Sequence, residues 1–247
     1  MELRDRFAEH GWVILRGAVP LARVRELEAA LDALYARWPQ TAPGEVWEVP
    51  GISRADVRLE AHARAPSLAA QIAEALGCER LQLLQDTALV KPARIGGPVL
   101  WHQDHTYTGY LEPARVISAR LALTPCHAGN GGMEVIDRSH RWGPITEVKA
   151  LSEASVGDAL GQRAQAFQRD VVRLELEPGD ISLHHCLTLH RSGSNTSAEA
   201  RKTLIGRFFD GVCRVRLEAL PEGARAHFPV RPDGGLDEAA FPLVFAR

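Results

Sequence analysis

The chain is poor in the features that mark membrane proteins and nucleic-acid-binding proteins. Its 247 residues carry a formal net charge of −2, so no excess of positive charge indicates nucleic acid or a membrane surface as a partner. No apolar run approaches the roughly 18 residues that a membrane-spanning helix needs. Residues 1–6 lack the apolar core of a signal peptide, and we therefore expect a cytoplasmic protein.

Cysteine is scarce as well. The four cysteines, Cys78, Cys126, Cys186 and Cys213, are far apart and form no C-x-x-C pair. This spacing argues against a zinc knuckle, and a disulfide framework is not expected in a chain of this size. We expect four reduced and mostly buried thiols, which leaves the ordinary classes of globular protein open.

Hydrophobic periodicity and turn residues predict helices first and short strands afterwards. Helices are expected over residues 3–10, from Pro20 to Trp38, and over 67–76. Strands are expected over residues 12–15, 81–91, 116–124, 133–136, 171–176, 181–185 and 202–215. Residues 41–50 and 92–98 read as loops, and the turn-rich tail, residues 222–235, has no predicted place.

This order of elements predicts a mainly β fold with flanking helices. The expected core is a double-stranded β-helix (jelly-roll, cupin-like) wrapped by N-terminal helices. We expect one domain over residues 1–247, with helical support in 1–78, the jelly-roll core in 79–216 and an insert at 143–169. Barrels of this size hold one small-molecule site. The sequence predicts neither the oligomeric state nor whether the insert closes as a lid.

The stretch from Trp101 to Tyr107 contains two candidate metal ligands, His102 and Asp104. On an extended strand, His102 and Asp104 would point to the same side, because residues two apart share a face. Two histidines and one carboxylate form the facial triad that holds iron(II) and leaves coordination positions open. Taken alone, the pair also fits a histidine at a strand edge beside a solvated aspartate.

A second stretch, residues 179–201, offers the missing groups. His190 can complete the triad, and a 2-oxo acid and O₂ can then bind the open positions on iron. Arg201, eleven residues later, can bind a distal carboxylate of the 2-oxo acid through two parallel hydrogen bonds, although a lone arginine also fits a surface salt bridge. The hydroxyl groups of Ser192 and Thr203 can support the same carboxylate.

These residues resemble the phytanoyl-CoA dioxygenase family of iron(II)/2-oxoglutarate-dependent oxygenases. The resemblance runs from Phe7 to about Phe209 and is strongest at Val90-Lys91-Pro92, at Trp101-His102-Gln103-Asp104, from Asn130 to His140, and from Gly179 to Lys202. It implies that His102, Asp104 and His190 are the iron ligands, that Arg201 anchors 2-oxoglutarate beside Ser192, and that Thr87 lines the cosubstrate pocket. His184 and His185 precede the motif and are not expected to bind iron.

One position departs from the family pattern. The family usually has Trp sixteen residues after the ligand aspartate, where this chain has Arg120. If the strand register holds, Arg120 points into the site and should meet an anion, because a buried charge is costly without a partner. If the register slips, Arg120 lies outside.

Halogenases of the family replace the ligand carboxylate by a small residue, and the retained Asp104 therefore favours hydroxylation.

The resulting prediction is a dioxygenase that hydroxylates a small molecule, a natural product or a polar metabolite, with release of succinate and CO₂. Desaturation, cyclisation or epimerisation by the same cofactors remains an alternative. So do a non-catalytic jelly-roll binding protein and a zinc hydrolase with the same ligands. The candidates for a polar substrate pocket are His105, Tyr107, Tyr110, Arg138, His140 and Arg191.

Overall fold

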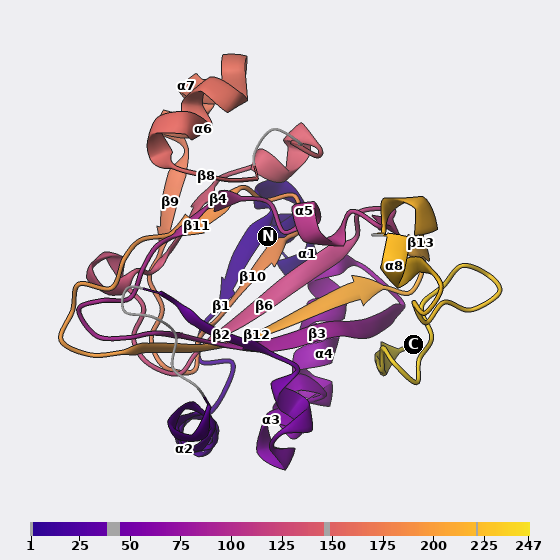
Figure 1. Cartoon of the computed structure of the whole chain (residues 1–247), viewed down its shortest axis with the longest axis horizontal. Coiled ribbons are helices and arrows are strands. Elements are labelled where there is room, and N and C mark those ends of the chain that lie inside the picture. The colour runs from indigo at the N-terminus through magenta and orange to yellow at the C-terminus, as the bar shows by residue number, and fades with distance from the viewer. Residues whose placement is uncertain (1, 39–44, 146–148, 221) are drawn as a thin grey trace.

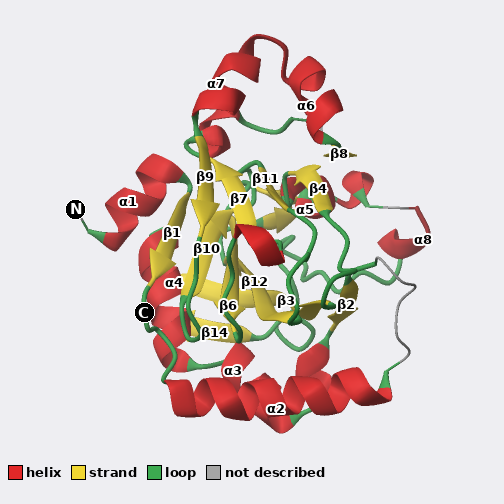
Figure 2. Ribbon diagram, turned by 90° about the vertical axis from the view of Figure 1, so that its left-hand side faces the viewer, coloured by secondary structure: helices red, strands yellow, loops and turns green. Residues whose placement is uncertain are grey.

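A computed structural model describes residues 2–38, 45–145, 149–220 and 222–247. Two antiparallel sheets enclose a cavity, and helices cover the outer face of the larger sheet (Figure 1 and Figure 2). The predicted class, a mainly β jelly-roll with N-terminal helices, is confirmed. No helix in the described part of the chain is long and apolar enough to cross a membrane.

The larger sheet has seven strands in the order β1-β10-β6-β12-β3-β14, and β2 pairs with a further part of β3. These strands are β1 (Trp12–Leu15), β2 (Trp47–Pro50), β3 (Arg80–Lys91), β6 (Val116–Ala122), β10 (Ile181–His185), β12 (Arg201–Asp210) and β14 (Leu243–Ala246). All seven residues of β6 are buried. Alternate residues therefore face the helices on one side and the cavity on the other.

The smaller sheet lies across the cavity and has the order β8-β4-β11-β7-β9. Its strands are β4 (Val99–His102), β7 (Met133–Ile136), β8 (Lys149–Leu151), β9 (Val171–Leu174) and β11 (His190–Ser192). A two-stranded sheet at the C-terminal end joins β5 (Leu111–Glu112) to β13 (Arg214–Val215). The strand predicted over 202–215 is thus two strands separated by a turn.

Helices form the support of the larger sheet. Leu27 and Leu31 of α2 and Ile72 of α4 share one core with the outward residues of β6 and β10. Burying each of these side chains contributes roughly 1.5–3 kcal/mol. The helices are α1 (Leu3–His10), α2 (Leu21–Arg37), α3 (Val57–Ala63), α4 (Pro66–Leu76), α5 (His105–Thr108), α6 (Glu153–Leu160), α7 (Ala164–Arg169) and α8 (Glu222–Arg225), with 3₁₀ turns at Ile52–Arg54, Ala128–Asn130, Ser139–Trp142, Gly161–Arg163 and Leu217–Ala219.

Two sequence predictions were wrong or incomplete. The segment 41–50 is not all loop, because its last four residues form β2 on the edge of β3, while residues 41–44 lie outside the described part. The tail, residues 222–235, also has a place, because it begins with α8 and its Phe228 packs edge to face on Tyr110 with ring centroids 5.2 Å apart. After the tail, β14 pairs with the start of β3, and Phe241 packs on Phe209 with ring centroids 6.4 Å apart. The four cysteines are free and buried, as expected.

Candidate metal centre and cavity

Strand pairing brings the three predicted metal ligands together. His190 begins β11 and lies directly opposite His102, the last residue of β4. Their rings are 4.1 Å apart between centroids. One potential ligand atom from each of His102, Asp104 and His190 lies within 4.8 Å of the other two, and all three residues are buried. Segments 86 residues apart in the sequence thus meet at one point of the cavity.

Asp104 does not lie on an extended strand with His102, and that part of the sequence prediction was wrong. The strand ends at His102, and Asp104 has helical backbone angles, φ −58° and ψ −27°, where α5 begins. Amide groups of Tyr107 and Thr108 donate to the Asp104 carbonyl and close this short turn. The turn, rather than strand alternation, therefore directs the carboxylate toward the imidazoles.

Hydrogen bonds leave the right atoms available for a metal ion. Nδ1 of His102 lies 2.8 Å from the Leu100 carbonyl oxygen, and Nδ1 of His190 lies 2.9 Å from that of Thr188. Because a carbonyl only accepts, each Nδ1 carries the proton and each Nε2 keeps its lone pair. The two Nε2 atoms are 3.7 and 3.9 Å from Asp104 Oδ1, which has no hydrogen-bond partner among the described residues although it is buried.

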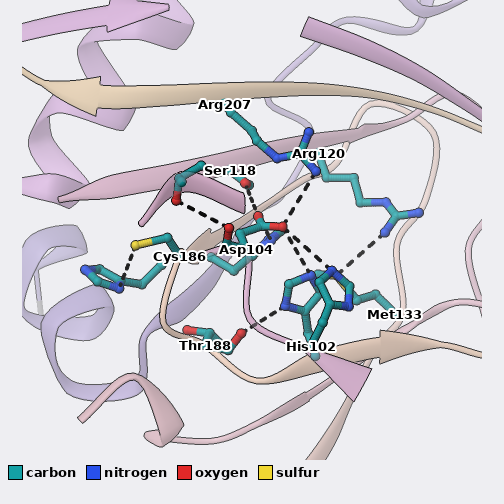
Figure 3. A network of polar contacts seen from close by, with 12 residues as sticks. His102, Asp104, Ser118, Arg120, Met133, Cys186, Thr188 and Arg207 are labelled. Atoms are coloured by element: carbon teal, nitrogen blue, oxygen red, sulfur yellow. Dashed lines mark hydrogen bonds and ion pairs between the residues drawn. The ribbon is translucent and has the colours of Figure 1, made fainter. Parts of the chain in front are cut away.

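The second carboxylate oxygen is held by the larger sheet. Ser118 Oγ donates to Asp104 Oδ2 over 2.6 Å, and His184 Nε2 lies 3.2 Å from the same oxygen. Figure 3 shows Ser118 and Arg207 beside Asp104, with His102 on its other side. His184 therefore supports the carboxylate, and His185 lies apart with its Nδ1 accepting the Leu187 amide proton over 3.1 Å. Neither joins the group of convergent ligand atoms.

The electrostatics favour the protonation states that a metal ion requires. Burial raises the pKa of Asp104, but Arg207, His102 and His184 outweigh it and hold that pKa well below its usual range. Burial lowers the pKa of His190 well below its usual range, and His102 adds to this effect. The carboxylate is thus ionised and the imidazole neutral. Three convergent, buried N and O ligand atoms, of which Asp104 Oδ1 accepts no hydrogen bond from the described residues, fit an iron(II) ion.

A buried cluster of cations lies farther along the sheet. Arg201 on β12 pairs in register with Lys91 on β3. Lys91 Nζ donates to carbonyl oxygens of Gly97, Ser192 and Gly193, the first over 2.8 Å. Arg201 donates to the Gly131 carbonyl oxygen, but its Nε and its other terminal nitrogen have no partner among the described residues.

Burial and mutual repulsion mark this cluster as a place for an anion. Burial lowers the pKa of Lys91 to about 6, with further lowering by Arg201 and Arg120, and lowers the pKa of Arg201 to about 9. The hydroxyl groups of Thr87 and Ser192 are also buried without a partner in the described part. Unsatisfied buried donors of this kind are typical of sites that bind a charged ligand.

The predicted cosubstrate residues differ in their access to the cavity, whose volume is about 590 Å³. Ser192 and Arg120 line it, whereas Thr87 and Arg201 lie behind its wall. Arg120 pairs in register with Ile205, so its side chain does face inward. Its guanidinium lies 3.6 Å from Met133 Sδ and 3.5 Å from Thr203 Oγ1, and no described carboxylate forms an ion pair with it.

The substrate-pocket candidates divide in the same way. Tyr107, Tyr110 and Arg191 line the cavity, but His105, Arg138 and His140 do not. Arg138 instead pairs with Glu9 at 2.8 Å, and His140 Nε2 lies 3.1 Å from the Ala8 carbonyl oxygen. Several lining residues were not predicted from the sequence, among them Gln85, Arg207, Phe228 and Phe241. Arg207 could have been found, because it lies an even number of residues after Arg201 on the same strand.

The jelly-roll fold and the two-histidine, one-carboxylate site define a mononuclear non-haem iron protein. A family model described as phytanoyl-CoA dioxygenase matches residues 7–203. The chain belongs to the phytanoyl-CoA dioxygenase family. The prediction of an iron- and 2-oxoglutarate-dependent oxygenase is thereby confirmed at the level of the family.

Curated relatives agree with this assignment. A 1-deoxypentalenic acid 11-beta-hydroxylase of Streptomyces arenae is 29% identical over 221 residues, which cover 80% of this chain and 76% of that protein. A phytanoyl-CoA dioxygenase of Arabidopsis thaliana is 28% identical over 131 residues, 53% of this chain and 45% of the relative. The match to the hydroxylase of Streptomyces exfoliatus spans 35% of that relative. The aligned stretches thus span less than half of two of these three relatives.

Solved structures share the fold along nearly the whole chain. The epimerase SnoN, in complex with Fe³⁺, alpha-ketoglutarate and nogalamycin RO, has a TM-score of 0.79 at 22% identity and covers 98% of this chain and 97% of its own. The carbocyclase SnoK from nogalamycin biosynthesis has a TM-score of 0.80 at 20% identity and covers 98% and 94%. Both are alpha-ketoglutarate-dependent non-haem enzymes by description.

Proposed function

We propose that this protein hydroxylates a small molecule with iron(II), 2-oxoglutarate and O₂, and releases succinate and CO₂. The observation that carries the proposal is the convergence of two Nε2 atoms on Asp104 Oδ1 inside a buried cavity. Relatives of this chain include hydroxylases of a carboxylic acid by name. We further propose that the chain is a single oxygenase domain and that it acts in the cytoplasm.

Each residue has a physical role in this proposal. His102, Asp104 and His190 hold the metal, and the Leu100 and Thr188 carbonyl oxygens fix the two imidazole tautomers. When bound, iron with 2-oxoglutarate supplies the activation of O₂ that removes hydrogen from an unactivated carbon. The surrounding sheets exclude water and hold the reactants in place, which is the contribution of the protein.

The residues that would hold the cosubstrate lie on and beside the inner face of β12. Arg201 supplies two free guanidinium nitrogens for the distal carboxylate, and the Ser192 and Thr87 hydroxyl groups add donors. Arg120 lines the cavity and lies 3.5 Å from Thr203 Oγ1, two residues from Arg201, so its guanidinium would contact the same anion. Lys91, with its Nζ on three carbonyl oxygens, keeps the local potential positive.

The test is direct. Protein loaded with iron(II) and 2-oxoglutarate without air should show the weak visible charge-transfer band of the complex, and admission of O₂ with a substrate should produce succinate. His102→Ala and His190→Ala should lose the band and the turnover, whereas His227→Ala, at an exposed histidine, should keep both. Full turnover by His102→Ala would refute the ligand assignment.

A second pair of variants tests the anchor and the rival functions. Arg201→Gln should raise the KM for 2-oxoglutarate sharply, whereas Arg173→Gln, on an exposed side chain, should not. Absence of the band in the wild-type protein would favour a non-catalytic binding protein. Metal-dependent turnover in the absence of O₂ would favour a zinc hydrolase. Turnover that needs O₂ but adds no oxygen atom to the substrate would favour desaturation, cyclisation or epimerisation.

A further inference from the structure

The inner face of β12 carries two arginines at opposite ends. Arg201 lies at one end, beside Lys91, and Arg207 lies six residues later. Arg207 pairs in register with Ser118, the residue that holds the Asp104 carboxylate. Because alternate residues of a strand share a face, both guanidinium groups belong to one row, with Arg207 at the metal end.

The guanidinium N–H groups of Arg207 form no short hydrogen bond with the described residues. Its contacts with polar atoms are long, 3.6 Å from a terminal nitrogen to Asp104 Oδ1 and 3.5 Å to Gln85 Oε1. Asp104 Oδ1 is also the oxygen that faces the two imidazoles, so a metal ion competes for it. Within the described residues, no other carboxylate forms an ion pair with Arg207. Its side chain is 18% exposed and lines the cavity.

The other two arginines in the described part that line the cavity are placed differently. Arg191 lines it but lies 2.6 Å from Glu134 Oε2, and its guanidinium stacks 5.0 Å from the Trp101 ring centre. Arg120 also lines it, but its guanidinium lies 3.6 Å from Met133 Sδ and 3.5 Å from Thr203 Oγ1, on the side of Arg201. Arg207 is therefore the lining cation that combines a position beside the metal ligands with donors free for an incoming anion.

The wall near Arg207 is aromatic and comes from the end of the chain. Tyr110 and Phe228 meet edge to face at 5.2 Å, and Phe228 lies 5.9 Å from Phe241. All three line the cavity together with Leu84. Phe228 and Phe241 lie beyond residues 7–203, the part that the family model matches. Two of the three rings thus lie outside the part that the family model matches, and the wall offers an apolar surface to a ligand.

We propose that the substrate is an organic acid with a compact apolar body. Arg207 and the Gln85 amide bind its carboxylate beside the metal, and Tyr110, Phe228 and Phe241 pack against its carbon skeleton. The cavity of about 590 Å³ is large enough for such a ligand next to a cosubstrate. This inference rests on the proposed function, since it concerns the substrate of the same site.

The experiment compares acids with their uncharged amides. The probes are 1-adamantanecarboxylic acid, indole-3-acetic acid and decanoic acid, each beside its primary amide, titrated calorimetrically into protein saturated with Mn(II) and 2-oxoglutarate. At least one acid should bind wild-type protein about 10-fold or more tightly than its amide, because a charge-assisted hydrogen bond is lost in the amide. Arg207→Gln should remove this preference, and Arg173→Gln should retain it.

The outcomes separate this proposal from the one on which it rests. No acid preference in the panel, including no binding by any acid, overturns the proposal. An equal loss of affinity for 2-oxoglutarate and for the acid in Arg207→Gln would assign Arg207 to the cosubstrate and overturn it too. A wild-type protein that prefers the acid but forms no charge-transfer band with iron(II) and 2-oxoglutarate would support acid binding and refute the oxygenase function.

Discussion

Ser118 Oγ donates a 2.6 Å hydrogen bond to Asp104 Oδ2, whereas the other carboxylate oxygen, Oδ1, is the one that lies near the His102 and His190 imidazoles. This bond crosses from β6 of the larger sheet to the turn after β4 of the smaller one. It orients Oδ1 toward the position between the Nε2 atoms. The metal site therefore depends on how the two sheets are held together and not on one loop alone.

Removal of that hydroxyl should weaken metal binding without unfolding the protein. We expect Ser118→Ala to lower the affinity for iron(II) or Mn(II) by about 10–100-fold, as is typical when a hydrogen bond to a ligand residue is lost. Calorimetric titration of the metal checks this. Ser152→Ala, at an exposed serine, is the control, and an unchanged affinity in Ser118→Ala would mean that His184 alone orients the carboxylate.

Arg120 should govern the choice of 2-oxo acid. Its guanidinium lies 3.5 Å from Thr203 Oγ1, on the row that leads to Arg201. If it contacts the distal carboxylate, Arg120→Gln should weaken 2-oxoglutarate binding by about 10-fold, the typical value of one charge-assisted hydrogen bond. Binding of 2-oxobutyrate, which lacks that carboxylate, should hardly change. Anaerobic titration of the charge-transfer band measures both, and parallel losses would place Arg120 elsewhere.

Acid should destabilise the fold through His185. Burial, with His140 and Arg115 adding to it, lowers the pKa of His185 from 6.5 to about 3. In the unfolded chain the imidazole takes up a proton at higher pH, so the stability from this group is complete above pH 6.5 and falls as the pH drops toward 3. The loss is at most about 1.4 kcal/mol per pH unit.

Denaturant unfolding at several pH values measures this slope. Protonation would also break the bond in which His185 Nδ1 accepts the Leu187 amide proton. His185→Asn retains an acceptor but does not titrate, and it should show a flatter decline of the unfolding free energy between pH 6.5 and 4. The same slope in both proteins would assign the acid sensitivity to other groups.

Gly131 should be much less tolerant of a side chain than Gly17. Both have positive φ, +75° and +57°, but a Cβ at Gly131 would meet the Gly193 carbonyl oxygen, whereas at Gly17 nothing lies within 4 Å. Gly17→Ala should therefore cost about 1 kcal/mol, the backbone penalty alone. Gly131→Ala should cost more and disturb Arg201, which donates to the Gly131 carbonyl oxygen. Chemical denaturation compares the two, and equal losses would contradict the contact.

Local patterns in the sequence account for much of the fold. The apolar spacing of α2 and the Pro66 and Gly77 ends of α4 are physical signals that short segments carry by themselves. The candidate metal ligands were predicted for a partly wrong reason, since Asp104 lies in the turn that begins α5 and not on the strand of His102. A separation of two residues fits either geometry, and only contacts with Ser118 and His184 decide between them.

The positions of the C-terminal aromatic residues could not be predicted from local sequence patterns. Phe228 and Phe241 have no periodic partners nearby. Phe228 packs against Tyr110 and Phe241 against Phe209, each more than 30 residues earlier in the chain. Arg207 was accessible in principle, because strand alternation places it in the row of Arg201. Its contact with Asp104 depends on the β6 register, which no local pattern specifies.

Two rings of the aromatic wall, Phe228 and Phe241, come after β12 has ended at Asp210. Part of the surface around the proposed substrate therefore belongs to a later stretch of the chain than the three candidate metal ligands. Exchange of everything after that strand between homologues should change the substrate preference while the metal site persists.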